Sequence, residues 1–442
     1  MIAEILSIGD EITCGKILDT NSQWLARELT NLGVWVLYHT TVGDDLDACA
    51  EVFRIASERA DIVISTGGLG PTADDLTRES IATMLGVPLE HNADAFESIK
   101  ALFQKRGRAM PSNNEKQALI PQGGKAIRNP NGTAPGVDVT AEREKRDEKR
   151  SLQSHFRVIS LPGVPAEMRE MWHDSVHDTL EAFCQEMTGR NVVIRSRSIH
   201  SFGYGESQVA AMLPEIFSGS EYPLVGITAD RATITLFIQT EGETEEDCSE
   251  QIEPIARKIY DTLGPLIYGE ANQTLADVAC EILRRQGKTL AVMEWGTHGL
   301  LSDALASSPL AKGRFLGGLV VRSADALKNA VRFSSELAGE QEIPDDFSEA
   351  TIQADPAQNE QIVALMGRHA LKMFNADYSL VVGPYPDDEK NGSPVFIGLG
   401  ISEKGGIMTV STESHPYGGH PALIDDLYTK RTLNLFRLKV RE

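Results

Sequence analysis

The first 85 residues alternate short apolar runs with amphipathic segments, and this alternation limits the possible folds more than any other feature. The runs at 3–9, 34–43 and 61–65 are rich in β-formers, whereas 21–33 and 46–58 have helical spacing of apolar residues. Strands that alternate with helices of this length predict a mostly parallel sheet with helices on both faces. Such sheets bind ligands at the carboxyl ends of their strands, so the loops after these strands should meet at one edge.

Acidic residues follow each of the three predicted strands. Asp10 comes after the first strand, Asp44 and Asp45 after the second, and Asp74 and Asp75 after the third. Because the loops after parallel strands lie at the same edge of the sheet, we expect these carboxylates to form one acidic rim.

The loop after the third strand, within STGGLGPTADDLTRE (65–79), combines this acidity with glycines. Gly67, Gly68 and Gly70 have no side chains, so their backbone N–H groups can approach a phosphate closely. The N-terminus of the helix that follows adds a partial positive charge. Carboxylates beside such a loop are best explained by a divalent metal ion, Mg²⁺, Mn²⁺ or Co²⁺, that bridges them to phosphate oxygens.

A simpler role for these aspartates stays open. Asp74 or Asp75 is suited to cap the helix that begins near Leu76, which is a common duty of aspartate before an apolar run. The loop also matches neither the G-x-x-x-x-G-K-[ST] phosphate loop nor the G-x-G-x-x-G dinucleotide fingerprint. The site hypothesis therefore depends on several acidic loops meeting at one rim.

Composition restricts the partners and the compartment. The formal net charge of −22 argues against nucleic acid or an anionic membrane as a partner, although a metal ion can reverse the local field for a phosphorylated small molecule. The five cysteines form no CxxC pair, and the N-terminus lacks a signal-peptide pattern. No stretch approaches the roughly 18 apolar residues that a membrane span needs. We therefore expect a cytoplasmic protein with reduced thiols.

The length of 442 residues predicts two to three domains. The strand–helix pattern assigns 1–175 to the first domain, with a charged insertion at 141–156 that we interpret as a solvated hairpin tip unable to fill a core. Residues 190–270 read as a small α+β module, and 273–442 as a third, α/β region with a long polar connection at 335–356.

Several ordered motifs carry a family resemblance. The segments SIGDEI, DTNSQWLARELTNLG, TVGDD, STGGLGPTADDLTRE, NPNGTAPG and LPGVPAEMREMW together resemble the CinA family of competence/damage-inducible proteins. The resemblance implies an α/β fold class: an N-terminal parallel-sheet sandwich similar to the molybdopterin-binding proteins MoaB and MogA, a KH-like α+β middle domain around SFGYGES, and an α/β C-terminal CinA domain. It also implies a homodimer.

For the N-terminal domain the resemblance implies a metal-dependent pyrophosphatase. Its small-molecule nucleotide substrate would be ADP-ribose, cleaved to AMP and ribose 5-phosphate. Functional aspartates of the related pterin enzymes fall here on Asp44 and Asp75. We expect these two residues to be catalytic and to hold the metal together with Asp74, while the glycine loop binds the pyrophosphate.

Further site residues are candidates with simpler alternatives. Glu79 lies three to four residues beyond the aspartates and is a candidate base, although a surface glutamate fits the pattern equally well. Asn131 and Thr133 of NGTAPG are candidate polar contacts to the ligand, against the alternative of an ordinary asparagine–glycine turn. Two other functions stay open for the whole chain: a non-catalytic molybdopterin- or nucleotide-binding protein, and a structural scaffold.

The C-terminal domain departs from its family. There the family is similar to nicotinamide mononucleotide deamidases, which use a serine in an AESCTGG turn, but the corresponding segment is AVMEWGTHGLLSDAL (291–305). Trp295 stands where the serine would be, and an indole supplies neither the nucleophile nor the space. The family's SVTGIAGPDGG loop becomes LVVGPYPDDEKNGSP, which gains Tyr385. We expect the deamidase activity to be lost and the domain to serve packing or an oligomer interface.

The segment ESHPYGGHP near the C-terminus contains His415 and His420. Two histidines without a third ligand are weak evidence for a metal, and the prolines and glycines around them predict a flexible loop.

Overall fold

The structure is a computed structural model, and it describes residues 1–143, 152–217, 222–335, 348, 356–386, 394–403, 406–418 and 420–440. The chain divides into two compact units, Met1–Arg195 with Thr240–Gln251, and Ser196–Gln239 with Ile252–Glu442. Within the described residues, none of the helices combines the length and apolar character that crossing a bilayer requires.

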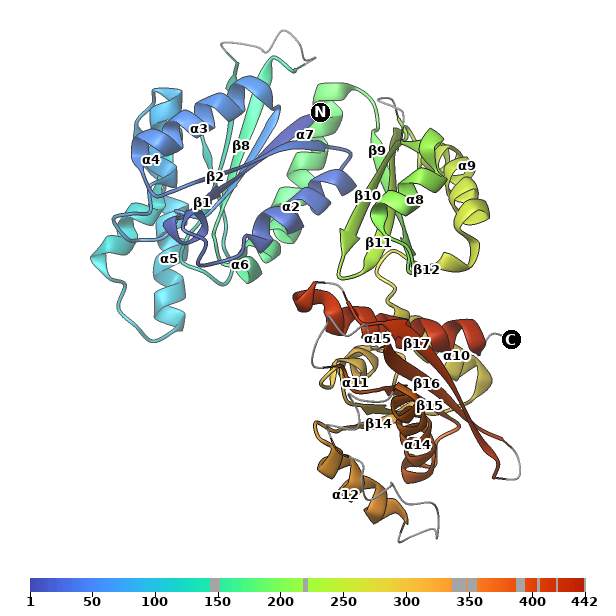
Figure 1. The fold of residues 1–442 in the computed structure, drawn as a ribbon. Helices are drawn as coiled ribbons and strands as arrows, with labels where there is room; N and C mark the ends of the chain where they lie inside the picture. The colour runs from blue at the N-terminus through green and yellow to red at the C-terminus, as the bar shows by residue number, and fades with distance from the viewer. Residues whose placement is uncertain are drawn as a thin grey trace. The chain divides into compact units, whose positions relative to one another are not determined.

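The first unit is built on a six-stranded sheet (Figure 1) with the order β2-β1-β3-β8-β7-β6. Its strands are β1 (Ile2–Ile8), β2 (Trp35–Val42), β3 (Ile62–Thr66), β6 (Lys125–Ile127), β7 (Gly136–Glu142) and β8 (His155–Leu161). The first three strands and β8 pair in parallel, whereas β7 and β6 add antiparallel strands at one side. The predicted mostly parallel sheet is confirmed.

Helices cover both faces of this sheet, as the alternation predicted. The helices are α1 (Asp10–Thr13), α2 (Thr20–Asn31), α3 (Leu46–Arg59), α4 (Thr77–Leu85), α5 (Ala93–Lys105), α6 (Pro165–Met171) and α7 (His177–Thr188). Alternate residues of β1 point to opposite faces: Ala3 and Ile5 pack in the core with α2, α6 and α7, and Leu6 and Ile8 in the core with α3 and α4. Burial on both faces explains why β1 is mostly apolar, and its one buried charged residue, Glu4, is paired with Arg59 at 2.6 Å.

The charged insertion at 141–156 is a hairpin at its base. Strands β7 and β8 pair antiparallel up to Glu142 and His155, while 144–151 lie outside the described residues. The expectation that nothing in the insertion fills a core is wrong at its two ends, because Phe156 belongs to the core under β8 and Ala141 packs against it. Arg143 and Leu152 are also buried. The Arg143 guanidinium donates to backbone carbonyls, including that of Ala60 at 2.9 Å, which satisfies the buried charge.

The first unit also contains a two-stranded sheet of β4 (Leu89–His91) and β5 (Leu119–Pro121), and two larger sheets follow in the chain, with the α+β and α/β patterns expected. A four-stranded sheet has the order β10-β11-β9-β12, and a five-stranded sheet the order β14-β13-β15-β16-β17. The elements of the first are β9 (Val193–Ser201), α8 (Glu206–Met212), β10 (Leu224–Asp230), β11 (Thr233–Gly242), α9 (Glu245–Leu263) and β12 (Ile267–Glu270). Those of the second are α10 (Leu275–Gln286), β13 (Leu290–Glu294), α11 (Leu300–Ser307), β14 (Phe315–Val320), α12 (Ala324–Ser335), α14 (Pro356–Phe374), β15 (Tyr378–Val382), β16 (Pro394–Ser402), β17 (Met408–Pro416) and α15 (Ile424–Lys439). The polar connection predicted at 335–356 lies almost entirely outside the described residues.

The loop predicted around the two C-terminal histidines is wrong for one of them. His415 lies in β17, where it pairs with Val395 of β16. Along this strand, half-buried and exposed residues largely alternate, which is the pattern of an edge strand with one covered face. His420 stands just before a short turn of 3₁₀ helix at Pro421–Leu423 and accepts a hydrogen bond from the Ala422 N–H at 3.2 Å.

Candidate functional site

A cavity of about 620 Å³ opens at the carboxyl ends of β1, β2, β3 and β8. Its walls come from the loop and helix start after β1, from Asp44 after β2, from Gly67–Asp75 after β3 and from Pro162–Pro165 after β8. Residues from distant parts of the sequence meet here because parallel strands end at the same edge. The predicted meeting of these loops is confirmed.

The cavity is strongly acidic. Six carboxylates line it, from Glu11, Asp19, Asp44, Asp74, Asp75 and Glu167, and none of the described residues on its walls is lysine, arginine or histidine. Hard divalent cations prefer oxygen ligands of this kind. An anionic ligand brought to these walls without a cation would meet only like charge from the side chains.

Asp44 is held at the centre of this charge by a reciprocal pair of hydrogen bonds. Its carboxylate accepts from the Asp10 N–H at 3.0 Å, and the Asp10 carboxylate accepts from the Asp44 N–H at 3.1 Å. Burial raises the pKa of Asp44, and the charges of Asp10, Glu11 and Asp74 raise it further, against a lowering by the backbone hydrogen bond. A carboxylate in this environment is stabilised by any cation that enters the cavity.

The glycine loop uses some of its N–H groups internally. Gly67 and Gly68 have φ values of 105° and 63°, and a Cβ on Gly67 would lie 2.1 Å from the Ile8 carbonyl oxygen, so this turn requires glycine. The Gly67 N–H donates to the Leu161 carbonyl at 3.1 Å. Within the described residues, the N–H groups of Gly68 and Leu69 have no hydrogen-bond partner, so these two donors are available to a ligand.

The carbonyls of the same loop are held from outside the cavity. Arg78, which is fully buried on α4, donates to the carbonyls of Leu69 and Gly70, each at 2.9 Å. Gln117 also donates to the Leu69 carbonyl, at 3.2 Å, and Lys116 reaches the Asp75 carbonyl at 3.0 Å. Sequence reasoning missed Arg78. The available signal was an arginine three residues after the acidic pair, in the first turn of the helix that follows the glycine loop.

The two adjacent aspartates have different positions. The Asp75 carboxylate accepts from the N–H of Gly70 at 2.7 Å and from the N–H of Thr72 at 2.8 Å, and also from the Thr72 hydroxyl. Asp74 is exposed and lines the cavity. The capping alternative is wrong, because α4 begins after Leu76 with no side-chain cap. Asp75 therefore closes the loop, while Asp74 presents its carboxylate to the cavity.

The other predicted residues are not all at the cavity. Thr133 lines it, but Asn131 does not, and the Asn131 amide donates to the carboxylate of Glu170 at 2.6 and 2.7 Å. Glu79 does not line the cavity either, and its Oε2 is buried without a hydrogen-bond partner in the described part of the chain. Asp45 caps α3 through a backbone N–H at 2.8 Å.

Asn21 is a cavity residue that sequence reasoning missed. Its side chain is 8% exposed, and its Nδ2 donates to the carbonyl of Gly163 at 2.8 Å and to the hydroxyl of Thr66 at 3.0 Å. A carbonyl only accepts, so the amide orientation is fixed, and Oδ1 is left without a partner among the described residues. It is an acceptor suited to a hydroxyl or amino group of a ligand. Its position in the first turn of α2, after the capping Asp19, was the available signal.

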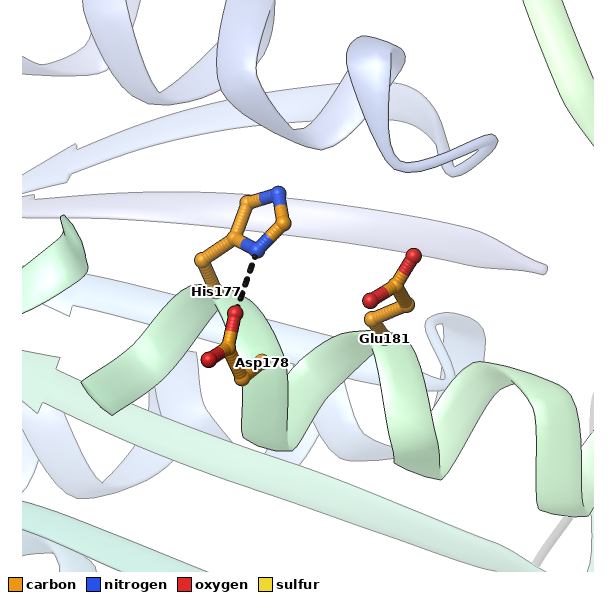
Figure 2. A group of neighbouring side chains, drawn as sticks. All are labelled: His177, Asp178 and Glu181. Atoms are coloured by element: carbon orange, nitrogen blue, oxygen red, sulfur yellow. Dashed lines mark hydrogen bonds and ion pairs between the residues drawn. The ribbon is translucent and has the colours of Figure 1, made fainter. Parts of the chain in front are cut away.

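A second acidic group lies away from the cavity. His177, Asp178 and Glu181 of α7 (Figure 2) form the one set of three in the described structure whose ligand atoms lie within 4.8 Å of one another. The Asp178 side chain is 85% exposed and pairs with His177 at 3.0 Å. Exposed sets of this kind are common without a metal, so we assign none. The three predicted aspartates of the cavity are not such a set.

Aromatic rings pack around residues 291–305, the segment that corresponds to the deamidase turn of the family. Trp295 is 9% exposed, and a Cβ on Gly296 would lie 2.2 Å from the Tyr385 ring. That ring in turn lies 5.5 Å from the Tyr417 ring and 5.2 Å from the Tyr428 ring, centroid to centroid. The Tyr385 ring thus packs directly against the backbone of Gly296, next to Trp295, which stands at the expected serine position.

The neighbouring carboxylate is used structurally. Glu294 is fully buried, and it accepts from the Thr297 hydroxyl at 2.7 Å and from the N–H groups of Leu301 and Ser302 at 3.0 and 2.8 Å. These bonds hold the start of α11 against the end of β13. Thr297 and Ser302 thus have structural partners rather than an open cavity before them.

The fold and this cavity define a class: an α/β protein with an acidic, glycine-lined cavity at the strand ends of a mostly parallel sheet. Residues 4–182 match the family model described as "Probable molybdopterin binding domain", and residues 196–269 match the "Damage-inducible protein CinA KH domain".

Relatives of nearly full length identify the family. A competence-damage inducible protein of Thermoanaerobacter pseudethanolicus is 33% identical over 91% of both chains, and one of Caldicellulosiruptor bescii is 32% identical over 100% of this chain and 99% of its own. Among solved structures, the protein CinA from Thermoplasma acidophilum is 36% identical over 40% of this chain and 96% of its own, with a TM-score of 0.34. The chain belongs to the CinA family of competence-damage inducible proteins.

Proposed function

We propose that the N-terminal cavity hydrolyses the pyrophosphate of a nucleotide, and that ADP-ribose, which yields AMP and ribose 5-phosphate, is a substrate. The observation that carries the proposal is the composition of the cavity. Two unpaired backbone N–H groups of a glycine loop lie beside six carboxylates, with no cationic side chain among the described residues of the walls. A site of this composition suits a phosphate ligand only if a cation accompanies it.

The residues present fit a divalent metal ion. The raised pKa of Asp44, which comes from burial first and then from neighbouring negative charge, is relieved by a cation, and Asp74 offers a second carboxylate at the same cavity. Mg²⁺ keeps several of its waters and uses only one or two carboxylates together with substrate phosphates, so a closed set of three protein ligands is unnecessary. When bound, such an ion supplies positive charge against the phosphate oxygens and polarises water for attack.

The chain's own residues then bind and orient the substrate. The N–H groups of Gly68 and Leu69 donate to phosphate oxygens, and the Oδ1 of Asn21 accepts from a ribose hydroxyl or an amino group. Asp75 acts through the loop, because its carboxylate fixes the backbone that carries the two donors. Hydrolysis adds one water across the bridging P–O bond: its oxygen joins one phosphorus, and the other phosphate leaves with the bridging oxygen.

Binding of a molybdopterin or nucleotide without turnover is the second candidate. The match of residues 4–182 to the molybdopterin-binding model favours it. The same cavity would serve, since a pterin phosphate needs the same combination of backbone donors and cation.

Purified protein with ADP-ribose and Mg²⁺, Mn²⁺ or Co²⁺ separates the two candidates. AMP release, measured by chromatography, supports hydrolysis, whereas binding in calorimetry without AMP release supports the second candidate. If the protein neither released AMP nor bound ADP-ribose, both candidates would be overturned. Asp44→Asn should abolish AMP release. Asp47→Asn is the matched control, because Asp47 is exposed in the first turn of α3 and does not line the cavity.

We also propose that the C-terminal domain has lost deamidase activity. Trp295 and Tyr385 support this, since their rings fill the segment where a serine nucleophile would need open space. Incubation with nicotinamide mononucleotide should release no ammonia, and measurable turnover would contradict the proposal.

A further inference from the structure

A second cavity, of about 470 Å³, has the opposite charge. It is lined by residues of α15, of β17 and of the turn after β9: Phe202, Gly203, Glu413, His415, Arg431, Asn434, Leu435, Leu438 and Lys439. An arginine, a lysine and a histidine line it together with one carboxylate, in a chain whose net charge is −22. A volume of this size is in the range of small-molecule sites.

The Arg431 guanidinium has an unsatisfied hydrogen-bond donor. Its Nη1 is buried without a hydrogen-bond partner, and no ion pair of its guanidinium occurs within the described residues. The guanidinium carbon lies 5.0 Å from the centroid of the Tyr428 ring, and the Tyr428 hydroxyl donates to the Pro416 carbonyl at 2.9 Å. Tyr428 thus positions the guanidinium through its ring and through a side-chain hydrogen bond from Arg431, and Nη1 is the guanidinium nitrogen left without a partner in the described residues. A buried guanidinium N–H without an acceptor is costly, which makes an anion at this place stabilising.

His415 and Lys439 are also loosely held. Both approach Glu413, but at 3.8 and 3.7 Å, which is longer than a hydrogen bond. The Nε2 of His415 is buried and has no hydrogen-bond partner in the described structure. Glu413 thus compensates part of the charge without satisfying the donors, and these groups remain able to bind a ligand.

We propose that this cavity binds the phosphate group of a small phosphomonoester. Arg431 offers a planar fork of donors, Lys439 an ammonium and His415 a ring nitrogen, and three donor side chains match the three terminal oxygens of a phosphate better than the two of a carboxylate. The side chains of Phe202 and Leu435 give an apolar wall for the rest of the ligand. The proposal does not depend on the N-terminal activity.

Binding should leave a signature on His415. Burial lowers the pKa of His415, and the positive charge of Arg431 lowers it further, against the raising effect of Glu413. A bound phosphate adds negative charge beside the ring, so the pKa of His415 should rise on binding. Lys439 is the remaining charged group that lines this cavity.

The test uses the full chain at constant ionic strength, with inorganic phosphate, AMP and ribose 5-phosphate as probes. Histidine ring resonances are followed by NMR, and the His415 signal is assigned from its loss in His415→Gln. We expect phosphate to shift this signal and raise its titration midpoint, and Arg431→Gln to weaken phosphate binding about tenfold or more, as for loss of a charge-assisted hydrogen bond.

Two further variants make the result decisive. Lys439→Gln should weaken binding without risk to the fold, because this side chain is 56% exposed. Lys312→Gln, an exposed lysine of the same domain outside the cavity, is the matched control and should bind as the wild type does. The proposal is overturned if the His415 signal does not respond at about 10 mM phosphate, well above a Kd of about 1 mM, or if both cavity variants bind as tightly as the wild type. ADP-ribose hydrolysis should be unchanged in all of them, which separates this site from the N-terminal one.

Discussion

Asp75→Asn distinguishes a loop-closing aspartate from a metal ligand. In the structure one oxygen of Asp75 accepts from the Gly70 N–H at 2.7 Å, and the other accepts from the Thr72 N–H at 2.8 Å and from the Thr72 hydroxyl. An asparagine keeps one acceptor, but its NH₂ group meets the Thr72 N–H, which is also a donor. The substitution therefore breaks the loop closure at Thr72 and leaves the shape of the side chain unchanged.

The expected loss follows from these contacts. A hydrogen bond to a charged acceptor contributes about 1.5–3 kcal/mol, and Thr72 is exposed, so solvent reduces the expected loss to about 1–2 kcal/mol. For a domain of this size that lowers Tm by about 2–8 °C. Since the loop carries the N–H groups of Gly68 and Leu69, we also expect a higher KM for ADP-ribose at an unchanged metal requirement.

Thermal unfolding and AMP release over a range of Mn²⁺ concentrations measure both quantities. Asp74→Asn is the matched variant: its exposed carboxylate lines the cavity, so its loss should weaken the apparent metal affinity, and because its bond to Thr72, which lowers its pKa, is solvent-exposed, Tm in the absence of metal should fall less than in Asp75→Asn. If Asp75→Asn instead keeps its Tm and loses metal affinity, the loop role is wrong and Asp75 is a metal ligand.

Other expectations follow from the same cavity and from the C-terminal domain. Without added metal, Asp44→Asn should raise Tm at neutral pH, because burial raises the pKa of the native carboxylate above its unfolded value; the gain should shrink as pH falls toward the ordinary aspartate pKa of about 3.9, and a gain independent of pH would contradict this origin. Gly67→Ala should cost at least about 1–3 kcal/mol in chemical denaturation, since the new Cβ meets the Ile8 carbonyl at 2.1 Å; wild-type stability would show that the turn tolerates a side chain. Arg78→Lys should lower stability by about 1.5–3 kcal/mol and raise KM for ADP-ribose, because an ammonium cannot bridge both loop carbonyls; unchanged kinetics would refute its role in the loop. Trp295→Ser should not produce deamidase activity, and ammonia release from nicotinamide mononucleotide would refute this.

The sequence predicted the parts of the site that depend on local pattern. Strand–helix alternation is a property of short windows, and the parallel sheet then brings Asp44, Asp74 and the glycine loop to one edge regardless of side-chain detail. The pattern did not predict which hydrogen-bond partners each side chain has or in which direction it points. Whether Asp75 faces the cavity or its own loop depends on the backbone angles between Gly70 and Thr72, which no spacing rule specifies.

Buried polar residues were missed for the same reason. Arg78 follows two aspartates and reads as a surface residue, yet it is fully buried because two loop carbonyls need a donor there. Glu79 is close to the cavity loop in sequence but does not line the cavity. It lies on α4, where successive side chains point about 100° apart, so closeness in sequence does not place a side chain on the cavity wall. His415 was expected in a loop because prolines and glycines follow it, but the strand before them extends through it.

The two cavities can be separated by one perturbation, because they would hold phosphate by different physics. In the acidic cavity the described walls offer no cationic side chain, so a chelator such as EDTA should remove ADP-ribose binding altogether. In the basic cavity Arg431 and Lys439 supply the charge themselves, so phosphate binding reported by His415 should persist in EDTA and weaken with added salt. Calorimetry with ADP-ribose and NMR with phosphate, each with and without EDTA, check this. If EDTA removed both signals, a metal would be needed at both sites and the basic cavity would not be an anion site in its own right.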